Sequence, residues 1–323
     1  MKGFARTILS MLLLLLLSLG SARADGWGQL SFNEATDSAG GVALHYVFSE
    51  RLRAKSYEIG FVLPSSSLRF KELGTGIGIG RYDQNALVHR VQLEVGRAIQ
   101  PYGGAVVAEV RAASGGYAMN LRARGISAPE RVLTGIQQVA VRAVEAYLSD
   151  NYLTHLREHV VIPDYGRLAG HYIAAMQPVA EALNRLAPDA GKRDKLTLAL
   201  TFMQSIPYDD FTLRRRESGY VVPPDMLVRN KGDCGTKSVA LASLLATLIP
   251  DLPVVIILIP EHALMGVGMM AGLSEHSLTR DGRSYLLVEP VGPAQLPPGQ
   301  ISSQTRKALA NGQDITILPV RRP

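Results

Sequence analysis

The sequence is poor in cysteine, because its 323 residues contain only one, Cys234. A single cysteine excludes a disulfide within the chain. Exported proteins often carry paired cysteines, so an unpaired one has two interpretations. It is either an inert, buried thiol or a functional one. The residues around Cys234 decide between them.

A hydrophobic run long enough to span a membrane is also missing at the N-terminus. The Leu-rich run from Met11 to Leu19 is about half of the ~20 residues that a spanning helix needs. Lys2 and Arg6 precede it, and the small-x-small triplet 22–24 follows it. We therefore expect a signal peptide, cleaved after Ala24, and export to a bacterial periplasm. A retained N-terminal anchor is the alternative, and a lipid-attached form is excluded because no cysteine lies near the cleavage site.

Strong charge of one sign is absent once residues 1–24 are removed. They hold three of the 34 basic residues and none of the 28 acidic ones, so the net charge falls from +6 to +3. No basic stripe with interleaved aromatic residues is present, which argues against a nucleic-acid partner. The basic run 214–216 is followed by Glu217, and we expect it in a solvated loop.

The first half of the remaining chain shows short alternating runs broken by Gly, Ser and Asn. Such runs are typical of strands, and they predict an all-β, sandwich-like domain over residues 25–126. The Gly-rich piece 74–80 lacks the Lys-Ser/Thr of a phosphate-binding loop, so we expect a turn or strand there. The predicted strands cover residues 41–50, 56–63, 86–96, 104–112 and 117–123.

The second half changes to helical patterns and then to strands. Ser127, Pro129 and Glu130 are typical of a helix start, which predicts a linking helix within residues 127–160. Helices followed by strands predict an α+β domain over 161–323. The expected helices cover 165–187, interrupted by Pro178, then 192–206 and a segment that begins at Cys234. The expected strands cover 253–260, 262–269 and 284–290.

Cys234 follows Gly232-Asp233 at the predicted start of a helix. Unpaired backbone N–H groups and the helix dipole favour a thiolate at that position, although the charge of Asp233, the expected N-cap, works against it. The rest of the helix is apolar on nearly every side, so we expect it to be buried. The alternative interpretation is a capped core helix with an incidental cysteine.

A thiolate nucleophile also needs a base, and we predict His262 in that role. It begins a strand directly after the apolar run 253–260, whereas the other six histidines lie in the predicted β domain, the early helices or a polar loop. Glu289 ends the apolar strand 284–290 and is the predicted acid that orients the imidazole. Glu261 would point to the opposite face of its strand, and Asp281 belongs to an Asp-Gly turn.

Four segments in this order resemble the transglutaminase-like superfamily. They are LALTFMQSIPYDD, KGDCGTKSVALASLLATL, EHALMGVGM and YLLVEPVGP, and the resemblance covers residues 165–295. It implies a papain-like core with Cys234 as nucleophile, His262 as general base and acid, and Glu289 as the orienting acid, where the family usually has Asp. It also implies an oxyanion hole formed by the backbone N–H of Cys234 and a side chain, with Tyr208 or Gln204 as candidates.

The resemblance implies acyl transfer through a thioester. We expect a periplasmic cysteine peptidase or amidase that acts on a protein or peptide amide, with the β domain selecting the substrate or docking a partner protein. One alternative is a transglutaminase with an amine acceptor. Another is a catalytically silent binding protein on the same fold, motivated by Glu289 in place of Asp.

No cofactor is predicted, although some exported relatives depend on calcium. Asp209, Asp210 and Glu217 offer oxygen ligands. They lack the regular spacing of a calcium-binding loop, so solvated loop charges are the expected alternative.

Overall fold

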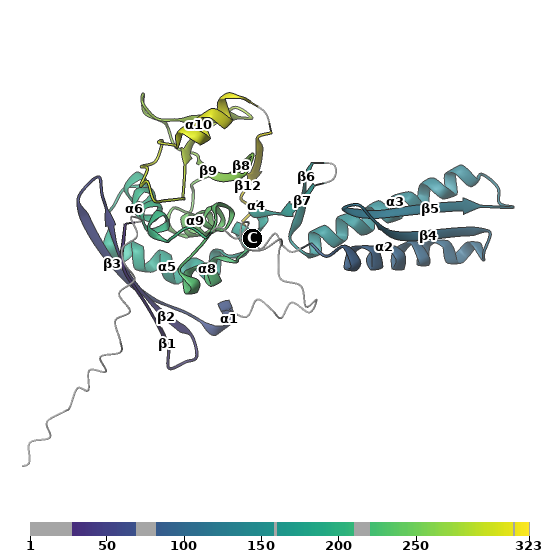
Figure 1. Cartoon of the computed structure of the whole chain (residues 1–323), viewed down its shortest axis with the longest axis horizontal. Helices are drawn as coiled ribbons and strands as arrows, with labels where there is room; N and C mark the ends of the chain where they lie inside the picture. The colour runs from purple at the N-terminus through teal and green to yellow at the C-terminus, as the bar shows by residue number, and fades with distance from the viewer. Residues whose placement is uncertain (1–27, 69–81, 158–159, 210–219, 313, 323) are drawn as a thin grey trace, which may run out of the picture.

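The computed structural model describes residues 28–68, 82–157, 160–209, 220–312 and 314–322 (Figure 1). Helices and strands both occur along the chain, which confirms the mixed α+β class. The predicted signal peptide, the Gly-rich piece 74–80 and the basic run 214–216 lie outside the described residues. Among the residues described, no helix is long and apolar enough to cross a bilayer.

The described chain begins with an antiparallel sheet of β1 (Gln29–Thr36), β2 (Val42–Glu50) and β3 (Lys55–Leu63). Alternate residues of β2 and β3 enter the main hydrophobic core of the molecule. The ring of Tyr46, for example, packs edge-on against Phe202, with 5.1 Å between the ring centroids. This sheet is therefore a layer of the main core and not a separate domain. A one-turn helix, α1 (Ser65–Leu68), follows it.

Four further elements form an arm that extends away from the rest of the molecule (Figure 1). The antiparallel hairpin of its two strands is covered on one face by its two helices, and these enclose a hydrophobic core separate from the main one. The elements are α2 (Gln84–Ile99), β4 (Val106–Ala113), β5 (Gly116–Ala123) and α3 (Pro129–Asp150), with the 3-10 turn η1 (Gln100–Tyr102) after α2.

The strand predicted over residues 86–96 is wrong, because this segment lies within α2. The all-β domain predicted over 25–126 is therefore wrong as well. Val91, Leu93 and Val95 alternate with polar residues, as in a strand, but Leu93 is 42% exposed. The residues that are buried recur at helical spacing along one face of the helix. They are Leu87, Val88, Val91 and Val95.

The helix predicted after Ser127 is confirmed as α3, which serves the arm as well as linking it to the main core. A small hairpin of β6 (Leu153–Arg157) and β7 (Val160–Pro163) then returns the chain to that core.

Within the described residues, five helices build the helical side of the main core, with α9 at the centre (Figure 1). The predicted interruption at Pro178 is wrong, because Pro178 lies inside a continuous helix and the break falls at Tyr172 instead. The helices are α4 (Tyr165–His171), α5 (Ile173–Leu186), α6 (Lys192–Ser205), α8 (Pro223–Arg229) and α9 (Cys234–Leu248).

An antiparallel sheet in the order β10-β11-β9-β8-β12 covers α9. One face of the sheet packs on α9, and the other forms a second cluster with α10 (Ser303–Ala310). With both faces covered, every residue of β8 is buried. The strands are β8 (Val254–Ile259), β9 (His262–Val267), β10 (Ser277–Arg280), β11 (Arg283–Val288) and β12 (Thr316–Pro319). The three strands predicted here are confirmed as β8, β9 and β11.

Candidate active site

Cys234 is the first residue of α9, as the sequence predicted. The carboxylate of Asp233 caps the helix by accepting a hydrogen bond from the backbone N–H of Thr236 at 2.7 Å. The thiol is partly exposed, whereas almost all of the following helix is buried in the main core. A buried helix holds its first residue rigidly, so Cys234 is an accessible thiol on a fixed support.

His262 begins β9, and its ring pairs with one of the other predicted residues, Glu289. Its Nε2 lies 3.1 Å from Oε1 of Glu289. Cys234 lies near enough to the ring to help raise the pKa of His262. Three residues separated by 28 and 27 positions in the sequence therefore come near one another where α9 packs on the sheet.

The neighbours of His262 change its protonation. Burial disfavours the charged ring, but the hydrogen bonds and negative charges of Cys234 and Glu289 outweigh it and raise the pKa of His262 to about 9. The imidazole is therefore protonated at neutral pH, with Cys234 nearby and the carboxylate of Glu289 3.1 Å from its Nε2.

Glu289 follows the end of β11 and is 6% exposed. Its Oε2 accepts a hydrogen bond from the N–H of Ser302 at 2.8 Å, and its Oε1 accepts one from the hydroxyl of Thr305 at 3.2 Å. Burial works to raise the pKa of Glu289, but the bonds from His262 and Ser302 prevail and lower it. Since Ser302 is the N-cap of α10, the helix dipole also favours the carboxylate.

Gln204 does not have the role expected for it, as a donor in the oxyanion hole. Its amide nitrogen donates to the carbonyl oxygens of Glu289 at 2.8 Å and of Leu296 at 2.9 Å. An amide NH₂ has two hydrogens, so both are committed, and the side chain is 1% exposed. The structure instead makes Gln204 a support that fixes the backbone of Glu289.

Tyr208 lies beside the turn that precedes Cys234. Its backbone forms a parallel bridge with Gly232. The N–H of Gly232 donates to the carbonyl of Pro207, and the N–H of Asp209 donates to the carbonyl of Gly232, both at 3.2 Å. The Tyr208 side chain is 37% exposed. Tyr208 therefore lies close to Cys234 in the structure, and its role as an oxyanion donor stays a prediction.

Two residues near Cys234 were missed by the sequence analysis. Tyr165 packs so closely on Gly235 that a Cβ atom there would lie 2.9 Å from the tyrosine oxygen. Burial, then the negative charges of Asp233 and Cys234, raise the pKa of Tyr165 well above its usual value. Lys237 is fully buried in the second turn of α9. A lysine within an otherwise apolar helix was the one indication of it in the sequence.

The expected calcium ligands are not brought together within the described residues. Asp210 and Glu217 lie outside them. In the part of the chain that is described, no group of three or more His, Cys, Asp or Glu side chains is placed to hold a metal ion.

Two comparisons with known proteins found no match for this chain. No protein-family model matches the chain, and no curated protein matches it either.

Proposed function

We propose that the protein is a cysteine hydrolase of transglutaminase-like fold, which cleaves a protein or peptide amide through a thioester. The observation that carries the proposal is the pair of His262 and Glu289, with Cys234 near enough to the same ring to help raise the pKa of His262. The order of elements supports it further, because the thiol starts a buried helix and the other two residues come from adjacent strands of the sheet packed on that helix.

In the first step, the Cys234 thiolate attacks the carbonyl carbon of the amide, and a C–S bond forms. The negative charge moves to the carbonyl oxygen, which the backbone N–H of Cys234 stabilises by donating a hydrogen bond. His262, protonated at neutral pH, gives its proton to the amide nitrogen as the C–N bond breaks. The products are an amine and a thioester on Cys234.

In the second step, water attacks the thioester, and neutral His262 accepts its proton. The C–S bond breaks, the acid product leaves, and the thiolate faces the imidazolium again. Glu289 holds the ring in place and stabilises its charge throughout both steps. Its longer side chain, in place of the usual aspartate, is accommodated because Ser302 and Thr305 provide donors at its far end.

The pattern of residues 1–24 supports export of this enzyme to the periplasm, where protein and peptidoglycan-linked peptides are the proposed substrates. An amine as acceptor in the second step would give a transglutaminase instead of a peptidase. The test therefore includes a labelled primary amine.

The experiment uses the protein without residues 1–24, incubated with a proteome-derived peptide library and the labelled amine. New termini identify hydrolysis, whereas incorporated label identifies transfer. Both should vanish in Cys234→Ala and fall sharply in His262→Ala. The matched control is His45→Ala, because His45 also pairs with a glutamate, Glu58, at 2.8 Å but on the surface.

Iodoacetamide reports on Cys234 alone, since it is the only cysteine. A thiol that reacts like a free cysteine, and whose rate ignores His262→Ala, would contradict the enzyme proposal. The protein would then be better explained as a binding module.

A further inference from the structure

Lys237 is an ionisable group that the proposed mechanism does not use. It lies three residues after Cys234 in α9, and its side chain is fully buried. The ammonium group donates a hydrogen bond to the carbonyl of Ile206. Its stem packs against Gly232, where a Cβ atom would lie 3.3 Å from Cγ of the lysine. One side chain thus contacts both the end of α6 and the turn before Cys234.

A buried ammonium is costly to a fold unless negative groups compensate for it. Burial lowers the pKa of Lys237 to about 7, while the negative charges of Asp233 and Cys234 oppose this shift. Burial and then the negative charge of Asp209 raise the pKa of Asp233, against its hydrogen bonds with Thr236 and the charge of Lys237, so a second carboxylate also lies near this turn. Since replacing buried ionic groups by apolar residues is often neutral or stabilising, a buried cation beside the candidate nucleophile points to a role beyond stability.

We propose that Lys237 is a positioning residue, whose buried positive charge favours the Cys234 thiolate together with His262 and whose bond to Ile206 holds residues 206–209 against the Gly232–Asp233 turn. This inference rests on the proposed function, because it concerns the same thiol.

The second part of this role follows from the path of the chain. The bridge between Tyr208 and Gly232 begins two residues after the carbonyl that Lys237 binds. Fixing that carbonyl fixes the start of the bridge. The buried Lys237 side chain thereby holds Tyr208, which borders the candidate site, in position.

The test compares Lys237→Gln and Lys237→Met, with Lys231→Met as the control for loss of an exposed lysine. Gln keeps a hydrogen-bond donor for Ile206 without the charge, whereas Met removes both. The rate of Cys234 alkylation by iodoacetamide is measured from pH 5 to pH 10. We expect its pH midpoint to rise by about one unit in both variants, which is roughly tenfold slower alkylation at low pH. Lys231→Met should not move it.

A second readout needs no substitution. In protein labelled with ¹³C-lysine, the Lys237 resonance should titrate near pH 7, and its midpoint should fall once Cys234 is alkylated, because the thiolate charge is lost. Unchanged alkylation in Lys237→Gln, or an unchanged Lys237 midpoint after alkylation, would overturn the proposed charge effect. His262→Ala, measured alongside, tests the proposed function separately. If His262→Ala leaves alkylation unchanged, the proposed function fails, but an effect of the Lys237 variants on alkylation can still be seen.

Discussion

The main core and the arm bury their apolar residues in different ways. In α9 of the core, twelve of fifteen residues are buried, whereas in α2 of the arm only four of sixteen are. A helix buried on all sides is fixed by its neighbours, while an amphipathic helix is fixed along one stripe. The candidate site is built on the first kind of helix, where a side chain at the helix start is held rigidly.

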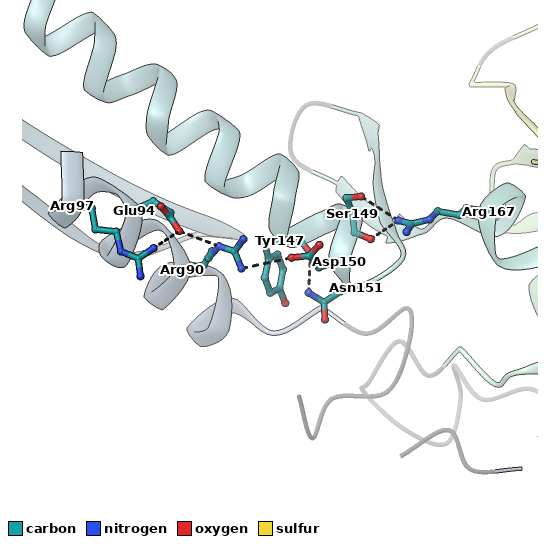
Figure 2. Close-up of polar contacts among 8 residues, drawn as sticks. All are labelled: Arg90, Glu94, Arg97, Tyr147, Ser149, Asp150, Asn151 and Arg167. Carbon is teal, nitrogen blue, oxygen red and sulfur yellow. Dashed lines mark hydrogen bonds and ion pairs between the residues drawn. The ribbon is translucent and has the colours of Figure 1, made fainter. Parts of the chain in front are cut away.

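Charged groups differ in the same way. His262 and Glu289 have side-chain exposures of 16% and 7%. At the base of the arm, Arg90, Glu94 and Asp150 form a chain of partly exposed ion pairs, with side-chain exposures of 40%, 32% and 62% (Figure 2). Exposed pairs contribute about 0–1 kcal/mol each, whereas burial strengthens electrostatic interactions. Among the described residues, Cys234, His262 and Glu289 of the candidate site all come from elements of the main core, and none comes from the arm.

The largest effect is expected when the buried pair of His262 and Glu289 is broken. Glu289→Gln removes the charge that holds the imidazolium, so we expect hydrolysis to fall by about 100-fold or more. Glu289→Asp should retain more activity than Gln, because it keeps the charge. Activity assays and iodoacetamide alkylation measure the effect. Glu58→Gln is the matched control, since it breaks the exposed His45 pair. Equal loss in both glutamine variants would mean that burial of the pair is irrelevant.

The next prediction separates the two hydrophobic cores. Ile136→Ala in the arm and Leu241→Ala in α9 each remove a buried side chain, and each should cost about 2–5 kcal/mol of unfolding free energy. We expect only the core variant to change the alkylation rate of Cys234. Hydrogen exchange should show increased opening confined to the arm in Ile136→Ala. Global opening in that variant would show that arm and core unfold as one unit.

The same contrast explains what the sequence could predict. Cys234, His262 and Glu289 were found because each stands at the end of a strongly apolar element, where a polar residue is conspicuous. The α2 helix was missed because it has few apolar residues. Three of them, Val91, Leu93 and Val95, alternate with polar residues as they would in a strand. Its capping residue, Asp83, accepts hydrogen bonds from Asn85 and Ala86 and could have identified the helix start.

The failures at the site come from contacts distant in sequence. Gln204 lies near the expected motif, but its amide binds carbonyls 85 and 92 residues away. The donors to Glu289 come from Ser302 and Thr305, at the start of a helix that the sequence analysis did not predict. Periodicity shows which residues are buried, and it does not show which atoms a buried polar group meets.

A third prediction concerns pH. His262 has a folded-state pKa of about 9 against 6.5 for an ordinary histidine. A raised pKa contributes stability in full below pH 6.5, and that contribution is lost as pH rises to 9. The shift corresponds to about 3 kcal/mol. Chemical denaturation across this range should therefore show His262→Gln losing most stability at pH 6 and least at pH 9.5. A difference independent of pH would contradict a protonated His262 in the folded protein.

The smallest expected effect lies at the joint between the two regions. Arg167 of α4 donates hydrogen bonds to the carbonyl and the hydroxyl of Ser149 at the end of α3 (Figure 2), and its guanidinium lies 4.2 Å from the centre of the Tyr152 ring. Arg167→Ala should cost about 1 kcal/mol and leave Cys234 alkylation unchanged. Small-angle scattering should then show a broader distribution of arm positions, and Arg97→Ala, which breaks an exposed pair within the arm, should not. Slower alkylation in Arg167→Ala would mean that the arm influences the site, and the separation of the two regions would fail.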